Sequence, residues 1–162
     1  MTADIDNLYP GYERLLSAVD YLIGSHDLPQ RLTGTGNLPV ALAQVGDRFG
    51  CRFVAATLGR EGVLGLELAS RRYYYCPAYR IEARDTTGAG DVFHGAFVFG
   101  LVRGWPIERI LDFSCASAAL NCTVLGARGG IKPVAEIEGL MRVGERREPA
   151  KAFAAFHSST ST

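Results

Sequence analysis

The stretch Asp85-Thr86-Thr87-Gly88-Ala89-Gly90-Asp91 stands directly before an apolar segment that predicts a buried helix ending at Gly104. Unpaired N–H groups at a helix N-terminus, together with the positive end of the helix dipole, attract anions, and glycine lets the backbone approach them closely. We therefore expect this stretch to bind phosphate. A carboxylate at the same place would repel phosphate, so Asp91 is expected to accept a proton from an attacking hydroxyl.

Segments with strand character alternate with segments with helix character around this stretch, which predicts an α/β fold with a largely parallel sheet. The expected strands cover residues 20–24, 52–57, 63–68 and 72–76, and the last two form a hairpin. The other expected helices cover residues 37–49, 107–122 and 134–143. Because the segment after Asp91 is apolar nearly all round, we expect its helix to be buried on every side.

Composition limits the classes of function. The 17 basic residues balance the 17 acidic ones, which disfavours binding to nucleic acid or to an anionic membrane surface. The four cysteines form no C-x-x-C pair, so they indicate neither a zinc site nor a disulfide framework. No apolar run reaches the roughly 18 residues of a membrane span, and no signal peptide is visible. We expect a cytoplasmic protein, with no nucleic-acid or membrane partner.

The chain is long enough for one domain, which we place over residues 1–145. Residues 146–162 are charged and then rich in Ala, Ser and Thr, and they predict a flexible tail. Within it, Arg146 and Arg147 are expected to be solvated charges.

Three glycine-containing turns, at residues 57–62, 88–91 and 126–130, follow predicted elements and could contact one nucleotide. Simpler interpretations stay open for several of their residues. Asp91 could only stabilise the helix dipole, and Asp85 could be a capping residue. Thr57 could be an ordinary strand residue, and Cys115 could be part of the core.

The chain resembles the ribokinase (PfkB) family of carbohydrate kinases, whose signature D-T-x-G-A-G-D it matches over residues 85–91. The resemblance extends from about Asp20 to Ile131, and it implies a three-layer α/β/α sandwich of the ribokinase type. It further implies that Asp91 is the catalytic base and that the amides of Gly88, Ala89 and Gly90 form an anion hole.

The family also implies contacts to ATP and to metal ions. The positions expected to line the nucleotide are Thr57, Gly59, Gly62, Cys115 and Gly126. Asp85 and Thr87 match positions that hold a monovalent cation such as K⁺ in the family. The family's magnesium-organising N-x-x-E is replaced by Ser25-His26-Asp27-Leu28, so Asp27 is the candidate for placing Mg²⁺. Because Cys115 stands at a position that often carries asparagine, we expect an apolar contact to the adenine.

The family's N-terminal half, with its glycine-glycine sugar motif, several strands and a β lid, has no counterpart in this sequence. Asp4-Ile5-Asp6 resembles the end of a central strand, so the chain is similar to the ATP-binding half and is expected to expose a sheet edge. Two functions stay open: an ATP-dependent kinase for a sugar or polyol, and a non-catalytic nucleotide- or phosphate-binding domain. A homodimer, or a partner that supplies the missing half, is the expected assembly.

Overall fold

The structure is a computed structural model that describes residues 1–5, 7–149 and 151–156. The chain forms two compact units. Of the described residues, the first unit comprises those within 1–58 and 64–75, and the second comprises those within 59–63 and 76–156. The stretch 85–91 therefore belongs to the second unit, whereas Thr57 and Asp27 belong to the first.

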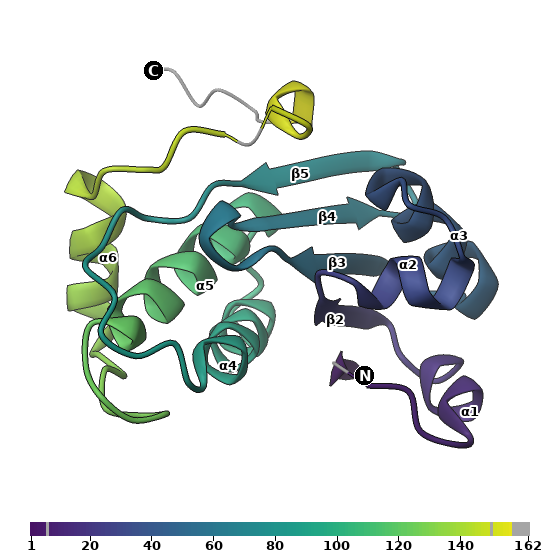
Figure 1. Ribbon diagram of the computed structural model, residues 1–162, viewed down its shortest axis with the longest axis horizontal. Helices are drawn as coiled ribbons and strands as arrows, with labels where there is room; N and C mark the ends of the chain where they lie inside the picture. The colour runs from purple at the N-terminus through teal and green to yellow at the C-terminus, as the bar shows by residue number, and fades with distance from the viewer. Residues whose placement is uncertain (6, 150, 157–162) are drawn as a thin grey trace. The chain divides into compact units, whose positions relative to one another are not determined.

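The sheet orders its strands as they follow one another in the sequence. Within the described residues it contains β1 (Thr2–Ile5), β2 (Tyr21–Ser25), β3 (Phe53–Thr57), β4 (Val63–Glu67) and β5 (Arg72–Cys76). The first three strands are parallel, and β4 runs opposite to β3 and β5 in Figure 1. The hairpin is confirmed, but the sheet is mixed and not largely parallel as expected, because β4 and β5 extend the parallel strands as an antiparallel pair. Asp6, expected at the end of a strand, lies outside the described residues.

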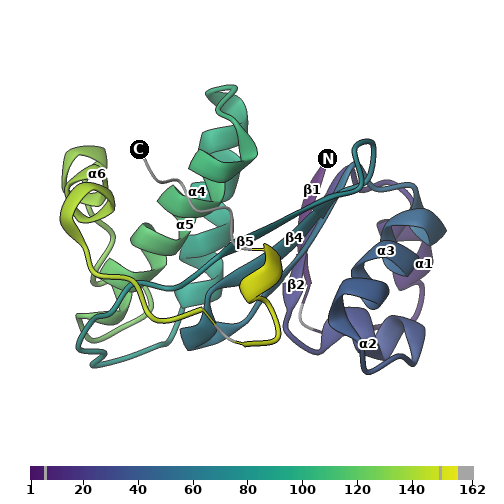
Figure 2. The ribbon, with the colours of Figure 1, turned by 90° about the horizontal axis from the view of Figure 1, so that it is seen from above.

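The helices of the first unit are α1 (Tyr12–Leu16), α2 (Leu28–Thr33) and α3 (Leu38–Phe49), and Figure 2 shows them on one face of the sheet. The prediction for α3 is confirmed: the Asn37 side chain caps it by accepting a hydrogen bond from Val40 N at 3.2 Å. The sequence did not predict α1 and α2, which have only five and six residues and are too short to show helical periodicity.

The helices of the second unit are α4 (Ala89–Val102), α5 (Ile107–Cys122) and α6 (Val134–Val143), with short 3₁₀ turns at Gly59–Glu61 and Ala154–Phe156. The helix α5 packs against both α4 and α6 (Figure 1). The predictions for α5 and α6 are confirmed, but the prediction that α4 is buried on every side is wrong. Its buried residues are Phe93, Ala96, Phe97 and Gly100, because another face opens onto a cavity and Val102 is 83% exposed.

In the described part of the chain, no helix combines the length and the apolar character needed to cross a membrane. Residues 150 and 157–162 of the expected tail lie outside the described residues.

Candidate active site

The turn before α4 is shaped by Gly88, the residue at its N-cap. Gly88 has a φ of +73°, and a Cβ built on it would lie 2.4 Å from the carbonyl oxygen of Ala127. Both the left-handed backbone and the close approach require glycine here. The turn is closed by Ala89 N, which donates to Thr86 O at 3.2 Å.

Three amides at the N-terminus of α4 have no acceptor among the described residues. The first N–H groups of a helix have no partner within it, and Ala89 N donates to Thr86 O. The three that have no acceptor are Gly88 N, Gly90 N and Asp91 N. Gly90 is exposed, and a Cβ added to it would meet no atom within 4 Å. The N-terminus of α4 therefore carries three N–H donors without an acceptor, and the side-chain position of Gly90 is open.

Asp91 lies in the first turn of α4 and is exposed. Among the described residues its carboxylate has no hydrogen-bond or ion-pair partner, and it lines a cavity of about 610 Å³ within the second unit. The cavity walls come from α4, α5, α6 and the loop after α5, and they are mostly apolar, with Arg128 and Lys132 contributed by the loop. A carboxylate placed in this way is accessible to a bound molecule.

Asp85 joins the two glycine turns of the second unit. Its Oδ1 accepts a hydrogen bond from Thr87 N at 2.9 Å, and its Oδ2 accepts one from Gly126 N at 2.8 Å. Hydrogen bonds from Thr87, followed by the one from Gly126, lower the pKa of this carboxyl. Asp85 thus bridges the two turns instead of capping α4, whose N-cap is Gly88, and its contact to a monovalent cation stays a prediction.

This arrangement makes the stability pH-dependent. The pKa of Asp85 is lower in the folded protein than its ordinary value of 3.8. The ionised carboxylate therefore contributes to the free energy of unfolding above pH 3.8, and this contribution is lost as the pH falls through the folded pKa. We expect Asp85→Asn to be less stable than the wild type at pH 6 and the difference to shrink toward pH 3. Urea unfolding at several pH values measures it. A difference that does not change with pH would show that Asp85 contributes through its shape alone.

Asn121, near the end of α5, is a site residue that the sequence analysis missed. Its side chain is fully buried; Nδ2 donates to Thr87 O at 3.3 Å and to Ala127 O at 3.1 Å, and Oδ1 accepts from Gly130 N at 3.2 Å. The sequence contains one signal for this role, an amide side chain among the small and apolar residues of a predicted helix. A polar side chain buried at such a position needs hydrogen-bond partners. Asn121 holds the turn before α4 and the loop after α5 together.

The turn at residues 59–62 also uses glycine for packing. Gly62 has a φ of +104°, and a Cβ built on it would lie 2.0 Å from the carbonyl oxygen of Cys76. Gly59 has a φ of +56° and is exposed. Cys115 is buried on α5, with its Sγ 3.9 Å from the same carbonyl of Cys76. Gly62 is therefore required for packing, whatever it contributes to nucleotide binding.

Thr57 and Asp27, in the first unit, have local partners. Thr57 Oγ1 donates to Gly24 O at 3.3 Å. Asp27 accepts a hydrogen bond from Ser25 Oγ at 3.0 Å, which lowers the pKa of its carboxyl, and it pairs with Arg31 at 3.5 Å. In the described ranges, no three His, Cys, Asp or Glu side chains come together in a metal-binding group.

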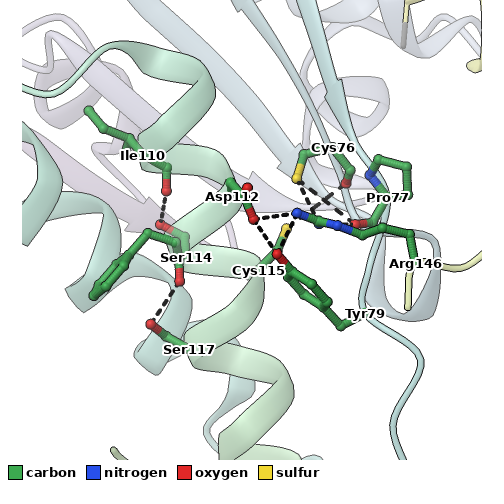
Figure 3. Close-up of polar contacts among 10 residues, drawn as sticks. Cys76, Pro77, Tyr79, Ile110, Asp112, Ser114, Cys115, Ser117 and Arg146 are labelled. Atoms are coloured by element: carbon green, nitrogen blue, oxygen red, sulfur yellow. Dashed lines mark hydrogen bonds and ion pairs between the residues drawn. The ribbon is translucent and has the colours of Figure 1, made fainter. Parts of the chain in front are cut away.

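The expectation that Arg146 is a solvated charge is wrong. It forms an ion pair with Asp112, and it donates to Tyr79 OH at 2.6 Å and to Pro77 O at 2.7 Å (Figure 3). Tyr79 OH in turn donates to Asp112 Oδ1 at 2.5 Å. The sequence shows that Arg146 is charged, but it does not show that Asp112, 34 residues earlier in the chain, lies beside it.

The model of the pfkB family of carbohydrate kinases matches residues 3–133, most of the chain. The chain belongs to the pfkB family. A curated relative, the 2-dehydro-3-deoxygalactonokinase of Haloferax volcanii, is 31% identical over 134 residues, which are 82% of this chain and 41% of that enzyme.

Solved structures of family members show the same fold. The ribokinase of Arabidopsis thaliana, complexed with ribose and ATP, has a TM-score of 0.77 and 28% identity over 88% of this chain and 47% of its own. A double mutant of the Vibrio cholerae fructokinase, with fructose, ADP and potassium bound, has a TM-score of 0.71 and 25% identity. The match covers 79% of this chain and 42% of the fructokinase chain. The ribokinase-like α/β fold is confirmed. The chain spans less than half the length of the curated relatives that it matches.

Proposed function

We propose that this protein transfers the γ-phosphoryl group of ATP to a hydroxyl group of a sugar or sugar-like alcohol, with Asp91 as the base. The observation that carries the proposal is the position of Asp91. Among the described residues its carboxylate has no partner; it lines a cavity and lies in the same helical turn as three amides that have no acceptor. The related enzymes in the family are sugar kinases by name, which supports a sugar acceptor.

The phosphoryl group would bind at the N-terminus of α4. Phosphoryl transfer depends mainly on positioning and on stabilising the charge of the transferred group, and preorganised N–H donors provide both. We propose that Gly88 N and Gly90 N, together with Asp91 N, donate to its oxygens, while Ala89 N, which was expected in the same anion hole, closes the turn by donating to Thr86 O. The dipole of α4, a helix of 14 residues, adds favourable potential at the same point.

The proposed nucleotide contacts follow the family resemblance: Thr57, Gly59, Gly62, Cys115 and Gly126. Mg²⁺ is usually held by one or two carboxylates together with the substrate's phosphates, so the lack of an acidic cluster among the described residues is compatible with it. By analogy to the family, Asp27 is the candidate residue for placing it. An ionised carboxylate has about four acceptor sites, so Asp85 could also contact K⁺, together with Thr87.

The deciding experiment measures ATP consumption by the purified chain with Mg²⁺ and K⁺ against a panel of sugars, sugar acids and polyols, beside calorimetric binding of ATP. We expect turnover with at least one acceptor. ATP binding without turnover on any of them would favour the non-catalytic nucleotide-binding domain, and failure to bind ATP would refute the proposal.

Two glycine variants separate folding from binding. Gly88→Ala is expected to destabilise the protein, since a left-handed backbone costs about 1–2 kcal/mol for a residue with a Cβ and the methyl group would clash with Ala127 O. Gly90→Ala has room for its methyl group and should be as stable as the wild type or more so, because alanine favours the helix by about 1 kcal/mol.

Gly90→Ala should nevertheless bind ATP less tightly, because its methyl group would stand where a phosphate approaches the open amides. We expect a loss of about tenfold, equivalent to ~1.4 kcal/mol. Thermal unfolding and calorimetry measure the two effects on the same samples. Unchanged ATP affinity in Gly90→Ala would place the phosphate elsewhere.

A further inference from the structure

Cys76 and Cys115 form a pair of thiols in the second unit. Cys76 is the last residue of β5 and is half-buried, whereas Cys115 lies in the middle of α5 and is buried. Cys115 Sγ donates a hydrogen bond to the carbonyl oxygen of Cys76 at 3.9 Å, so the two residues are in direct contact. Neither is in a disulfide. Contact between the two residues is a precondition for a disulfide bond between them.

Arg146 distinguishes Cys76 from the other cysteines. Its Nη1 donates to Cys76 Sγ at 3.3 Å, and its guanidinium is held in place by Asp112, Tyr79 and Pro77 O (Figure 3). Reactive cysteines typically lie beside a fixed cation, and Cys76 meets this condition.

The surroundings of the pair shift the pKa values of the two thiols in opposite directions. The hydrogen bond from Cys115, assisted by the charge of Arg146, lowers the pKa of Cys76 against the effect of burial. The same hydrogen bond, together with burial, raises the pKa of Cys115. Of the two thiols, Cys76 is therefore the one that loses its proton more readily. By contrast, burial raises the pKa of Cys51 to about 11 and also raises the pKa of Cys122.

We propose that Cys76 is a peroxide-reactive cysteine and that Cys115 resolves its oxidised form into a reversible Cys76–Cys115 disulfide. The Cys76 thiolate attacks hydrogen peroxide, so that an S–O bond forms, the O–O bond breaks and hydroxide leaves; sulfur is oxidised and peroxide is reduced. Cys115 then attacks the sulfenic acid. The S–S bond forms, the S–O bond breaks, and the leaving hydroxide takes the Cys115 proton as water.

The modification would act on the proposed nucleotide site. Cys115 is a proposed contact for the adenine, and Gly62 packs against Cys76 O, so a disulfide would alter two of its contacts. This consequence rests on the proposed function, whereas formation of the disulfide does not. We expect the oxidised protein to bind ATP more weakly and a dithiol reductant to restore the affinity.

The test treats the full chain with one equivalent of hydrogen peroxide, alkylates the remaining thiols and maps tryptic peptides by mass spectrometry without reduction. We expect peptide 73–80 to be linked to peptide 110–128. Because the second peptide also contains Cys122, Cys122→Ser should keep the link and Cys115→Ser should lose it. In Cys115→Ser the sulfenic acid should persist at Cys76 and be trapped by dimedone.

Two matched variants test the role of the cation. Arg146→Leu should slow the oxidation of Cys76 severalfold, whereas Arg147→Leu should leave the rate unchanged; thermal unfolding checks that both variants are folded. The proposal is overturned if Cys76 is oxidised no faster than Cys51, if the disulfide joins other cysteines, or if the Cys115→Ser variant shows no dimedone adduct. A disulfide that forms without changing ATP affinity would leave the modification site standing and remove Cys115 from the nucleotide site.

Discussion

Asp91→Asn is expected to lower the rate of sugar phosphorylation by about 10²–10⁴-fold while leaving the fold intact, because it keeps the shape of the side chain and removes the base. Asp91 is exposed and has no partner among the described residues, so no packing or hydrogen bond is lost. ATP binding should be equal or tighter, since a negative charge beside the phosphate site is removed. A coupled assay of ATP consumption and calorimetry with ATP measure these two effects.

Glu136→Gln is the matched control for this variant. Glu136 is exposed in the first turn of α6, so its charge faces a helix dipole as that of Asp91 does in α4, and it also forms an exposed ion pair with Lys132 at 3.8 Å. Either substitution should cost at most about 1 kcal/mol of stability through the dipole, and only Asp91→Asn should affect turnover. If both variants turn over ATP at the wild-type rate, Asp91 is a helix-stabilising carboxylate and the catalytic proposal fails.

Asn121→Ala is expected to produce the largest loss of stability, roughly 2–5 kcal/mol. The substitution removes three hydrogen bonds at once and leaves Gly130 N, which is buried, without its acceptor. An unsatisfied buried polar group costs about 1–3 kcal/mol, and the carbonyls of Thr87 and Ala127 lose their donor as well. Urea unfolding, with the midpoint and the slope fitted separately, measures the effect.

Thr123→Ala serves as the control for Asn121→Ala. Thr123 follows α5 and makes one local hydrogen bond, from Oγ1 to Leu120 O at 2.7 Å, which should be worth about 1 kcal/mol. Because Asn121 also fixes the turn before α4, its variant should bind ATP less tightly even at temperatures where it is folded. Equal losses of stability in the two variants would show that water replaces the partners of Asn121.

Much of the fold could be predicted because its signals are local. The hairpin of β4 and β5 follows from two β-rich runs separated by a short turn, and α3 follows from Asn37, the proline at the start of the helix and the spacing of its apolar residues. The family signature at residues 85–91 likewise placed Gly88 and Asp91 at the start of α4. Each of these signals lies within a short run of consecutive residues.

The sequence alone therefore determined the α/β class, the positions of most helices and strands, the family and the candidate base. Only the tertiary structure decided which groups hold the site together. Asp85 binds Gly126 N across 41 residues, Asn121 binds Thr87 O across 34, and Arg146 lies beside Cys76 across 70. Such contacts depend on how segments that are distant in the sequence pack against each other. A hydrogen bond between two distant segments leaves no periodicity or fixed spacing in the sequence, so it could not be predicted from the sequence.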